Sequence, residues 1–115
     1  MSVTIEKKVE ISALYNVYGA MLTDKQREIV DMFYNLDMSL AEIAESYDIS
    51  RQAVRDVIVR AGETLEKAEE ELHVYRDVIK LSEIIIDVKT SGKVERLDKI
   101  LNTLEEKYGM VSRTE

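Results

Sequence analysis

The side chains best suited to chemistry in this chain belong to three arginines and one glutamine that lie within ten residues of each other. Arginine can pair with the edge of guanine, and glutamine with the edge of adenine, through two hydrogen bonds each. We therefore expect Arg51 and Gln52 to meet base edges. Arg55 and Arg60 are placed to meet phosphates. Ser50 directly precedes them as a helix cap, so the candidate nucleic-acid-binding residues are Ser50, Arg51, Gln52, Arg55 and Arg60.

These residues fall on the second helix of a predicted helix-turn-helix, residues 40–59. Ser39 with Glu42 three residues later is a capping box, which predicts a helix that starts just after Ser39. Ser50 predicts the start of the second helix in the same way. Asp48 stands in the turn, where such a motif usually has glycine, and aspartate tolerates a left-handed backbone better than most residues. The residues expected to hold the corner shut are Ile43, Ala44, Tyr47, Ile49, Val54 and Val57.

The second helix divides into an inner and an outer face when its residues are placed about 100° apart. The inner residues are Ala53, Val54, Val57, Ile58 and Ala61. The outer residues are Arg51, Gln52, Arg55, Asp56, Val59 and Arg60. In proteins of this class the second helix enters the major groove, which favours the outer face as the binding surface. The alternative is an ordinary corner between two helices whose arginines are only solvated.

The net charge of −7 opposes simple binding to nucleic acid. Residues 22–61 carry five cations and eight acids, so the motif region is itself acidic. Only residues 51–60 are locally basic, with three arginines against Asp56. We expect weak nonspecific affinity from a single chain, and a dimer or a protein partner for useful binding.

The composition bounds the class of protein. The 115 residues include neither cysteine nor proline, which favours an all-α chain without disulfides or a thiol nucleophile. No apolar run approaches the roughly 18 residues that a membrane span needs, and the first ten residues lack a signal peptide's apolar stretch. We expect a cytoplasmic protein without membrane insertion. His73, with Glu70 three residues before it, has no second copy of that pair, so we expect no enzyme, no metal and no cofactor.

Two helices are expected before the motif. A first helix over residues 2–18 ends near Gly19, with an apolar stripe at Val9, Ala13, Leu14, Val17 and Tyr18. A capping box at Thr23 and Gln26 opens a second helix, which is expected to bury Ile29, Val30, Phe33 and Leu36. The recognition helix is expected to run on past Gly62 through Ala61, Leu65, Ala68 and Leu72. Its outer face there is acidic, at Glu63, Glu66, Glu69, Glu70 and Glu71. We assign residues 1–72 to this helix-turn-helix domain.

The last part of the chain, residues 73–115, reads as a helical hairpin. A heptad seam at Val74, Val78, Leu81, Ile85 and Val88 is joined by a second apolar side at Ile79, Ile84 and Ile86. After a break at residues 90–92, heptad spacing returns at Val94, Leu97, Leu101, Leu104 and Tyr108. A helix with two apolar sides needs two neighbours, which favours a homodimer through this hairpin. Packing within one chain is the alternative. Residues 110–115 read as a frayed tail.

The stretch LTDKQREIVDMFYNLDMSLAEIAESYDISRQAVRDVIVRA resembles region four of bacterial sigma factors, although Asp48 departs from the usual glycine. Nearly the whole chain resembles the YlxM family of small helix-turn-helix proteins, through its MLTDKQREI opening, DISRQAVRD core, glutamate-rich extension and C-terminal helices. Genes of that family lie beside those of the signal recognition particle GTPase. The resemblance implies a regulatory part in the signal recognition particle pathway, and the motif implies nucleic-acid binding without giving a target. A sigma factor is not expected, because nothing resembles the promoter-melting or polymerase-binding regions.

Three hypotheses follow. The first is a DNA-binding regulator that uses the outer face of the second helix. The second is a modulator of the signal recognition particle that binds its structured RNA or one of its proteins. The third is an adaptor without DNA binding, whose working surface is the acidic extension.

Overall fold

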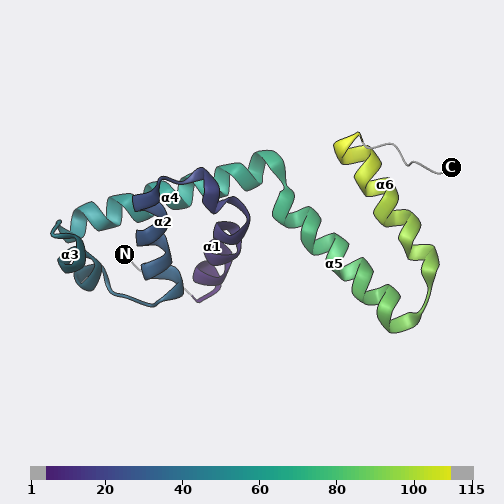
Figure 1. The fold of residues 1–115 in the computed structure, drawn as a ribbon, viewed down its shortest axis with the longest axis horizontal. Helices are drawn as coiled ribbons and strands as arrows, with labels where there is room; N and C mark the ends of the chain where they lie inside the picture. Colours follow the sequence, from purple (N-terminus) through teal and green to yellow (C-terminus); the bar gives the residue numbers. More distant parts are fainter. Residues whose placement is uncertain (1–4, 110–115) are drawn as a thin grey trace. The chain divides into compact units, whose positions relative to one another are not determined.

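The computed structural model describes residues 5–109, apart from the side chain of Arg96. In that range the chain forms six α-helices and no strand, which confirms the expected all-α fold. It divides into two compact units, residues 1–75 and residues 76–115, here called unit 1 and unit 2. The predicted domain boundary after residue 72 stays a prediction. The helices of each unit can be followed in Figure 1.

Unit 1 is built on one long helix, α4 (Arg51–Leu72), against which α1 (Ile5–Tyr18), α2 (Asp24–Val30) and α3 (Leu40–Tyr47) pack (Figure 1). Its interior holds two apolar clusters. The first consists of Ile11, Leu14, Tyr18, Leu22, Val30, Ala61, Leu65 and Ala68. The second consists of Ile29, Phe33, Ile43, Ala44, Val54 and Ile58. The two halves of α4 therefore serve different purposes, since the first half holds α3 and the second half holds α1.

The three helix starts predicted from caps are confirmed, while the start expected at residue 2 lies outside the described residues. Thr23 accepts a hydrogen bond from the Gln26 amide and Ser39 from the Glu42 amide, and both capping boxes are complete. The Ser50 side chain accepts from the Ala53 amide at 3.0 Å, which opens α4. Each cap satisfies an amide that has no partner inside its helix.

The predicted apolar stripe of α1 is partly wrong. Leu14 and Tyr18 are buried, but the third buried residue is Ile11, and Val9 is 65% exposed. Apolar side chains lie all round α1, so helical periodicity alone could not predict which side of it packs against α4. Lys7 and Lys8 add polar ties: Lys7 pairs with Glu66 on α4 at 2.8 Å, and Lys8 pairs with Asp37 at 3.0 Å.

A wide turn follows α2 and overturns another prediction. Residues Asp31–Asn35 form a π-helical turn, closed by a hydrogen bond from the Leu36 amide to the Asp31 carbonyl at 3.0 Å. Ile29, Val30 and Phe33 are buried as expected, but Leu36 is 61% exposed. A π turn holds more residues per turn than an α-helix, so positions after it fall out of the expected phase.

Helix α4 runs through Gly62 without a break, as predicted, but Leu72 is 49% exposed and outside the core. His73 ends the helix in a left-handed conformation (φ 58°). The next helix, α5 (Val74–Ser91), begins at the following residue. The buried stripe of α4 ends at Ala68.

A part-buried cluster of hydrogen bonds, here called the polar joint, links Tyr18 and Glu69 to the amides of Val74 and Tyr75 at the end of α4. It corrects the prediction that Glu69 lies on the acidic outer face. The Tyr18 hydroxyl donates to Glu69 Oε1 at 2.5 Å and accepts from the Val74 amide at 3.0 Å. The same Glu69 oxygen accepts from the Tyr75 amide at 3.0 Å. Tyr18 and Glu69 together therefore satisfy two of the amides that the start of α5 leaves without helical partners.

The joint predicts a loss of stability at alkaline pH. Burial raises the pKa of Tyr18 above its ordinary value, and the hydrogen bond to Glu69 raises it further. The Tyr18 hydroxyl therefore loses its proton at a lower pH in the unfolded chain than in the folded one. The free energy of unfolding is expected to fall as the pH rises above about 10. Urea unfolding at several pH values would measure this dependence, and Tyr18→Phe should reduce its slope. An unchanged slope in that variant would contradict the assignment.

Unit 2 contains most of α5, a short turn at Val94–Arg96 and α6 (Leu97–Tyr108), which ends at the left-handed Gly109 as expected. Lys107 Nζ lies 3.1 Å from Asp77 Oδ2 and joins α6 to α5. Leu81, Ile84 and Val88 are half-buried and lie at helical spacing on the Asp77 side of α5. The predicted heptad seam differs at Val78 and Ile85, which are exposed, and Ile84 lies with Leu81 and Val88 and not on the predicted second apolar side. The exposed apolar residues of α5 are Val78, Ile79, Ile85 and Ile86, at 40–62%.

Candidate nucleic-acid interface

Helices α3 and α4 meet at a tight corner. Asp48 takes the left-handed conformation predicted for the turn (φ 54°, ψ 47°), and the Ile49 amide donates to the Ala44 carbonyl at 3.0 Å. Ile43 and Ala44 on α3 are buried against Val54 on α4 within the second cluster. These contacts leave the outer face of α4 to solvent at its start.

An open groove of about 420 Å³ lies where the starts of α3 and α4 come together. Its lining residues are Ser39, Leu40, Ala41, Arg51, Gln52 and Arg55. Arg51 and Gln52 are exposed, and Arg55 is half-buried. The groove therefore gathers three of the five predicted site residues beside the first turn of α3.

The start of α3 is the part of the site that sequence reasoning missed. The amides of Leu40 and Ala41 precede the first hydrogen bonds of their helix, and the helix dipole adds partial positive charge there. Such a helix start favours an anion, and two guanidinium groups on α4 add full positive charge. The capping box at Ser39 marked this helix start in the sequence, but only the fold brings it to Arg51 and Arg55.

The other predicted site residues lie apart from the groove. Ser50 is exposed and occupied with capping α4. Arg60 is exposed, and its position falls about half a helical turn around α4 from Arg51. Arg60 can meet a neighbouring phosphate, but it does not line the groove.

One hydrogen bond on the outer face was not expected. Gln52 Nε2 donates to Asp56 Oδ1 at 2.9 Å, one helical turn further on. The glutamine predicted to read adenine is therefore already held by a carboxylate.

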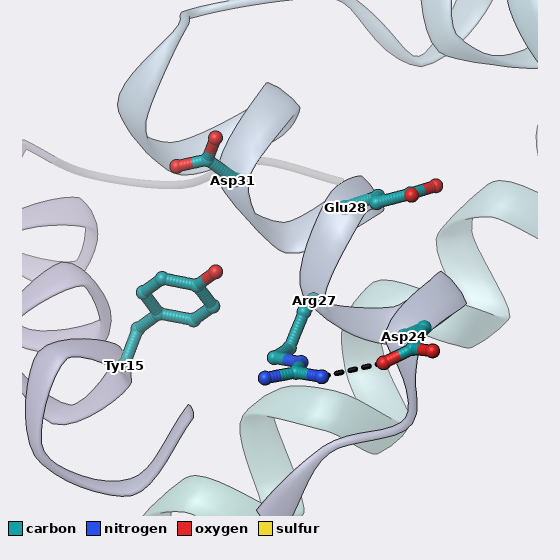
Figure 2. Close-up of a pocket in the computed structure, with 5 residues that line it drawn as sticks. All are labelled: Tyr15, Asp24, Arg27, Glu28 and Asp31. Atoms are coloured by element: carbon teal, nitrogen blue, oxygen red, sulfur yellow. Dashed lines mark hydrogen bonds and ion pairs between the residues drawn. The ribbon is translucent and has the colours of Figure 1, made fainter. Parts of the chain in front are cut away.

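A second pocket, of about 370 Å³, has the opposite electrostatic character. Tyr15, Asp24, Arg27, Glu28 and Asp31 line it, and Figure 2 shows Arg27 turned toward Asp24. Arg27 Nη2 lies 2.5 Å from Asp24 Oδ1. The hydroxyl of Tyr47 donates to Glu28, which raises the pKa of Tyr47 to about 12. Three carboxylates around one paired arginine repel phosphate, so this pocket is no second site for nucleic acid.

Among residues 5–109, no group of three or more His, Cys, Asp or Glu side chains is arranged to hold a metal ion. None of the helices in that range combines the length and the apolarity that crossing a membrane requires.

This fold defines a helix-turn-helix protein. Three helices pack against α4, a tight turn with a left-handed residue joins α3 to α4, and the outer face of α4 is exposed at its start. The chain belongs to the UPF0122 family, described as "Putative helix-turn-helix protein, YlxM / p13 like", whose model matches residues 5–96. The expected resemblance to the YlxM family is confirmed.

Streptococcal proteins are among its relatives. The UPF0122 protein of Streptococcus mutans is 50% identical over 80 residues, which cover 70% of this chain and 73% of that protein. The UPF0122 protein of Streptococcus equi subsp. zooepidemicus is 49% identical over 84 residues, covering 73% and 74% of the two chains. That of Streptococcus thermophilus is 48% identical over 84 residues, covering 73% and 76%.

Proposed function

We propose that this protein is a non-enzymatic regulator that binds duplex DNA with the start of α4 in the major groove. The observation that carries the proposal is the groove in which Arg51, Gln52 and Arg55 meet the start of α3. An arginine pair beside a helix start is suited to a phosphate next to a readable base edge.

Each residue then has a distinct role. Arg51 and Gln52 are exposed at the first turn of α4, where helices of this class touch bases. Arg55 is half-buried against the groove and would share a phosphate with the amides of Leu40 and Ala41. Arg60 would bind a flanking phosphate, while Ser50 keeps the first turn of α4 in place.

The charge of unit 1 limits the affinity of one copy. Its 75 residues carry eight cations and fifteen acids, so unit 1 accounts for the whole net charge of −7. Nonspecific binding, which depends on neutralised phosphates, should be weak and sensitive to salt.

Two copies joined through unit 2 would offset this weakness. Among the described residues of unit 2 the only buried one is Asp77, while α5 exposes Val78, Ile79, Ile85 and Ile86 and α6 exposes Leu97, Leu101 and Tyr108. Residues 76–115 carry eight cations and eight acids, so no net repulsion opposes their pairing. A homodimer through this apolar face would present two copies of α4 to paired half-sites.

The biological context that we propose is regulation of the signal recognition particle pathway in the cytoplasm. It rests on the family resemblance alone. In that context the particle's structured RNA is the competing ligand for the same groove, so it belongs in the test.

Fluorescence anisotropy at two salt concentrations tests the proposal, with random duplex DNA and signal recognition particle RNA as ligands. The double variant Arg51→Ala/Arg55→Ala is expected to weaken duplex binding about thirtyfold, since each such contact contributes about 1 kcal/mol or more. Lys25→Ala/Lys67→Ala is the matched control, because it removes the same charge from exposed positions outside the groove.

The outcomes separate the three hypotheses. Equal weakening by both double variants would show that only total charge matters. Tighter binding to the RNA would replace DNA with the particle as the target. Absence of binding to either ligand, even at low salt, would move the function to a protein partner and the acidic part of α4.

A further inference from the structure

A carboxylate lies on the outer face of α4. Asp56 is exposed one turn after Gln52, on the same helix as Arg51 and Arg55. A carboxylate repels phosphate, so its presence there opposes the nonspecific attraction that the arginines create. A surface that bound only the phosphate backbone of DNA would bind it more tightly without this carboxylate.

The hydrogen bond between Gln52 Nε2 and Asp56 Oδ1 orders two side chains that would otherwise rotate freely. It uses an amide hydrogen of Gln52, which leaves acceptors on both partners. Gln52 Oε1 and Asp56 Oδ2 have no hydrogen-bond partner in the described part of the chain. The pair is therefore richer in acceptors than a free glutamine is.

Base edges in the major groove differ in what they offer to such a pair. Cytosine N4 and adenine N6 carry donors, whereas guanine O6 and thymine O4 are acceptors. Against a donor, Gln52 Oε1 or Asp56 Oδ2 gains a hydrogen bond. Against a keto oxygen only the remaining Nε2 hydrogen of Gln52 can pair, and the Asp56 carboxylate meets an acceptor without a proton.

We infer that the Gln52–Asp56 pair is a specificity determinant that selects cytosine or adenine at one base position and rejects guanine and thymine. The inference rests on the proposed function and deepens it, because it states which bases the outer face of α4 accepts. Asp56 also lowers affinity for random duplex, which widens the ratio between specific and nonspecific binding.

The variant Asp56→Asn gives the sharpest test. Asparagine can still accept the hydrogen bond of Gln52 through its carbonyl oxygen, but its amide turns one acceptor into a donor. The expected result is a shift of preference toward guanine or thymine at that position by about tenfold. Affinity for random duplex is expected to rise about threefold, because one negative charge is removed.

Glu63→Gln is the matched control. Glu63 lies seven residues after Asp56, so it is exposed on nearly the same side of α4 and loses the same charge, but it has no contact with Gln52. It is expected to change neither the base preference nor the affinity by more than about twofold. Circular dichroism of both variants checks that α4 is intact.

Selection from a randomised duplex library, followed by sequencing, reads the preference of the wild-type protein and of both variants. The inference is overturned if Asp56→Asn keeps the wild-type preference, if Glu63→Gln shifts it equally, or if the wild-type protein selects no amino base. If the proposed function is wrong, the result is different. The wild-type protein would then show no duplex binding that replacement of Arg51 and Arg55 weakens.

Discussion

Replacing Glu69 with alanine is expected to lower the free energy of unfolding of unit 1 by about 2–3 kcal/mol. One oxygen of this side chain accepts from both the Tyr18 hydroxyl and the Tyr75 amide. Its removal leaves two donors without an acceptor, and Tyr18 is only 4% exposed, so water does not readily replace the carboxylate. Urea unfolding followed by circular dichroism at neutral pH would measure the loss.

Two further variants separate the joint from general effects of charge. Glu69→Gln keeps an acceptor oxygen and should lose about half as much stability, because hydrogen bonds to neutral groups are weaker. Glu70→Ala removes the neighbouring exposed acid and should change stability by less than about 0.5 kcal/mol. If Glu70→Ala costs as much as Glu69→Ala, the joint does not hold the end of α4.

The double variant Ile79→Glu/Ile86→Glu is expected to weaken self-association at least about a hundredfold. The two isoleucines lie seven residues apart on one side of α5 and are 40% and 62% exposed, so a single copy loses little when they change. In the proposed dimer they would be buried, and burying two unpaired carboxylates is very costly. Sedimentation velocity over a range of concentrations would measure the dissociation constant.

Lys80→Glu is the matched control for self-association. It changes the net charge by the same two units on the same helix, but it lies on the exposed polar side of α5. It should leave the dissociation constant within about threefold. A wild-type protein that stays monomeric at high concentration would contradict the homodimer outright, and equal weakening by Lys80→Glu would contradict the apolar face.

Local chemistry explains which parts of the fold could be predicted. The capping boxes at Thr23 and Ser39, the cap at Ser50 and the left-handed turn at Asp48 depend on neighbouring residues, and all four are confirmed. The length of α4 followed from an apolar stripe that keeps its phase past Gly62.

The wrong predictions share a different cause. The exposure of Leu36 follows from a π turn, and Leu72 is exposed at the last position of α4, directly before the left-handed His73. The role of Glu69 depends on Tyr18, fifty-one residues away. Helical periodicity assumes an unbroken helix and says nothing of distant partners, so none of these could be found from spacing.

The candidate site divides in the same way. Arg51, Gln52 and Arg55 were found because the outer face of a helix follows from its period. Their meeting with the start of α3 required the tertiary fold. The bond between Gln52 and Asp56 joins positions four residues apart, so spacing could have suggested it. Nucleic-acid binding by these residues stays a prediction.

The first core cluster joins residues that are added at different times during synthesis of the chain. Ile11 and Leu14 are buried with Leu65 and Ala68, which the ribosome adds about fifty residues later. At about 5–20 residues per second, the apolar side of α1 waits roughly three to ten seconds for its partner. A nascent chain that stalls before Leu65 therefore leaves that side open to chaperones and proteases. Unit 1 ends at Tyr75, so all of its residues are made before those of unit 2.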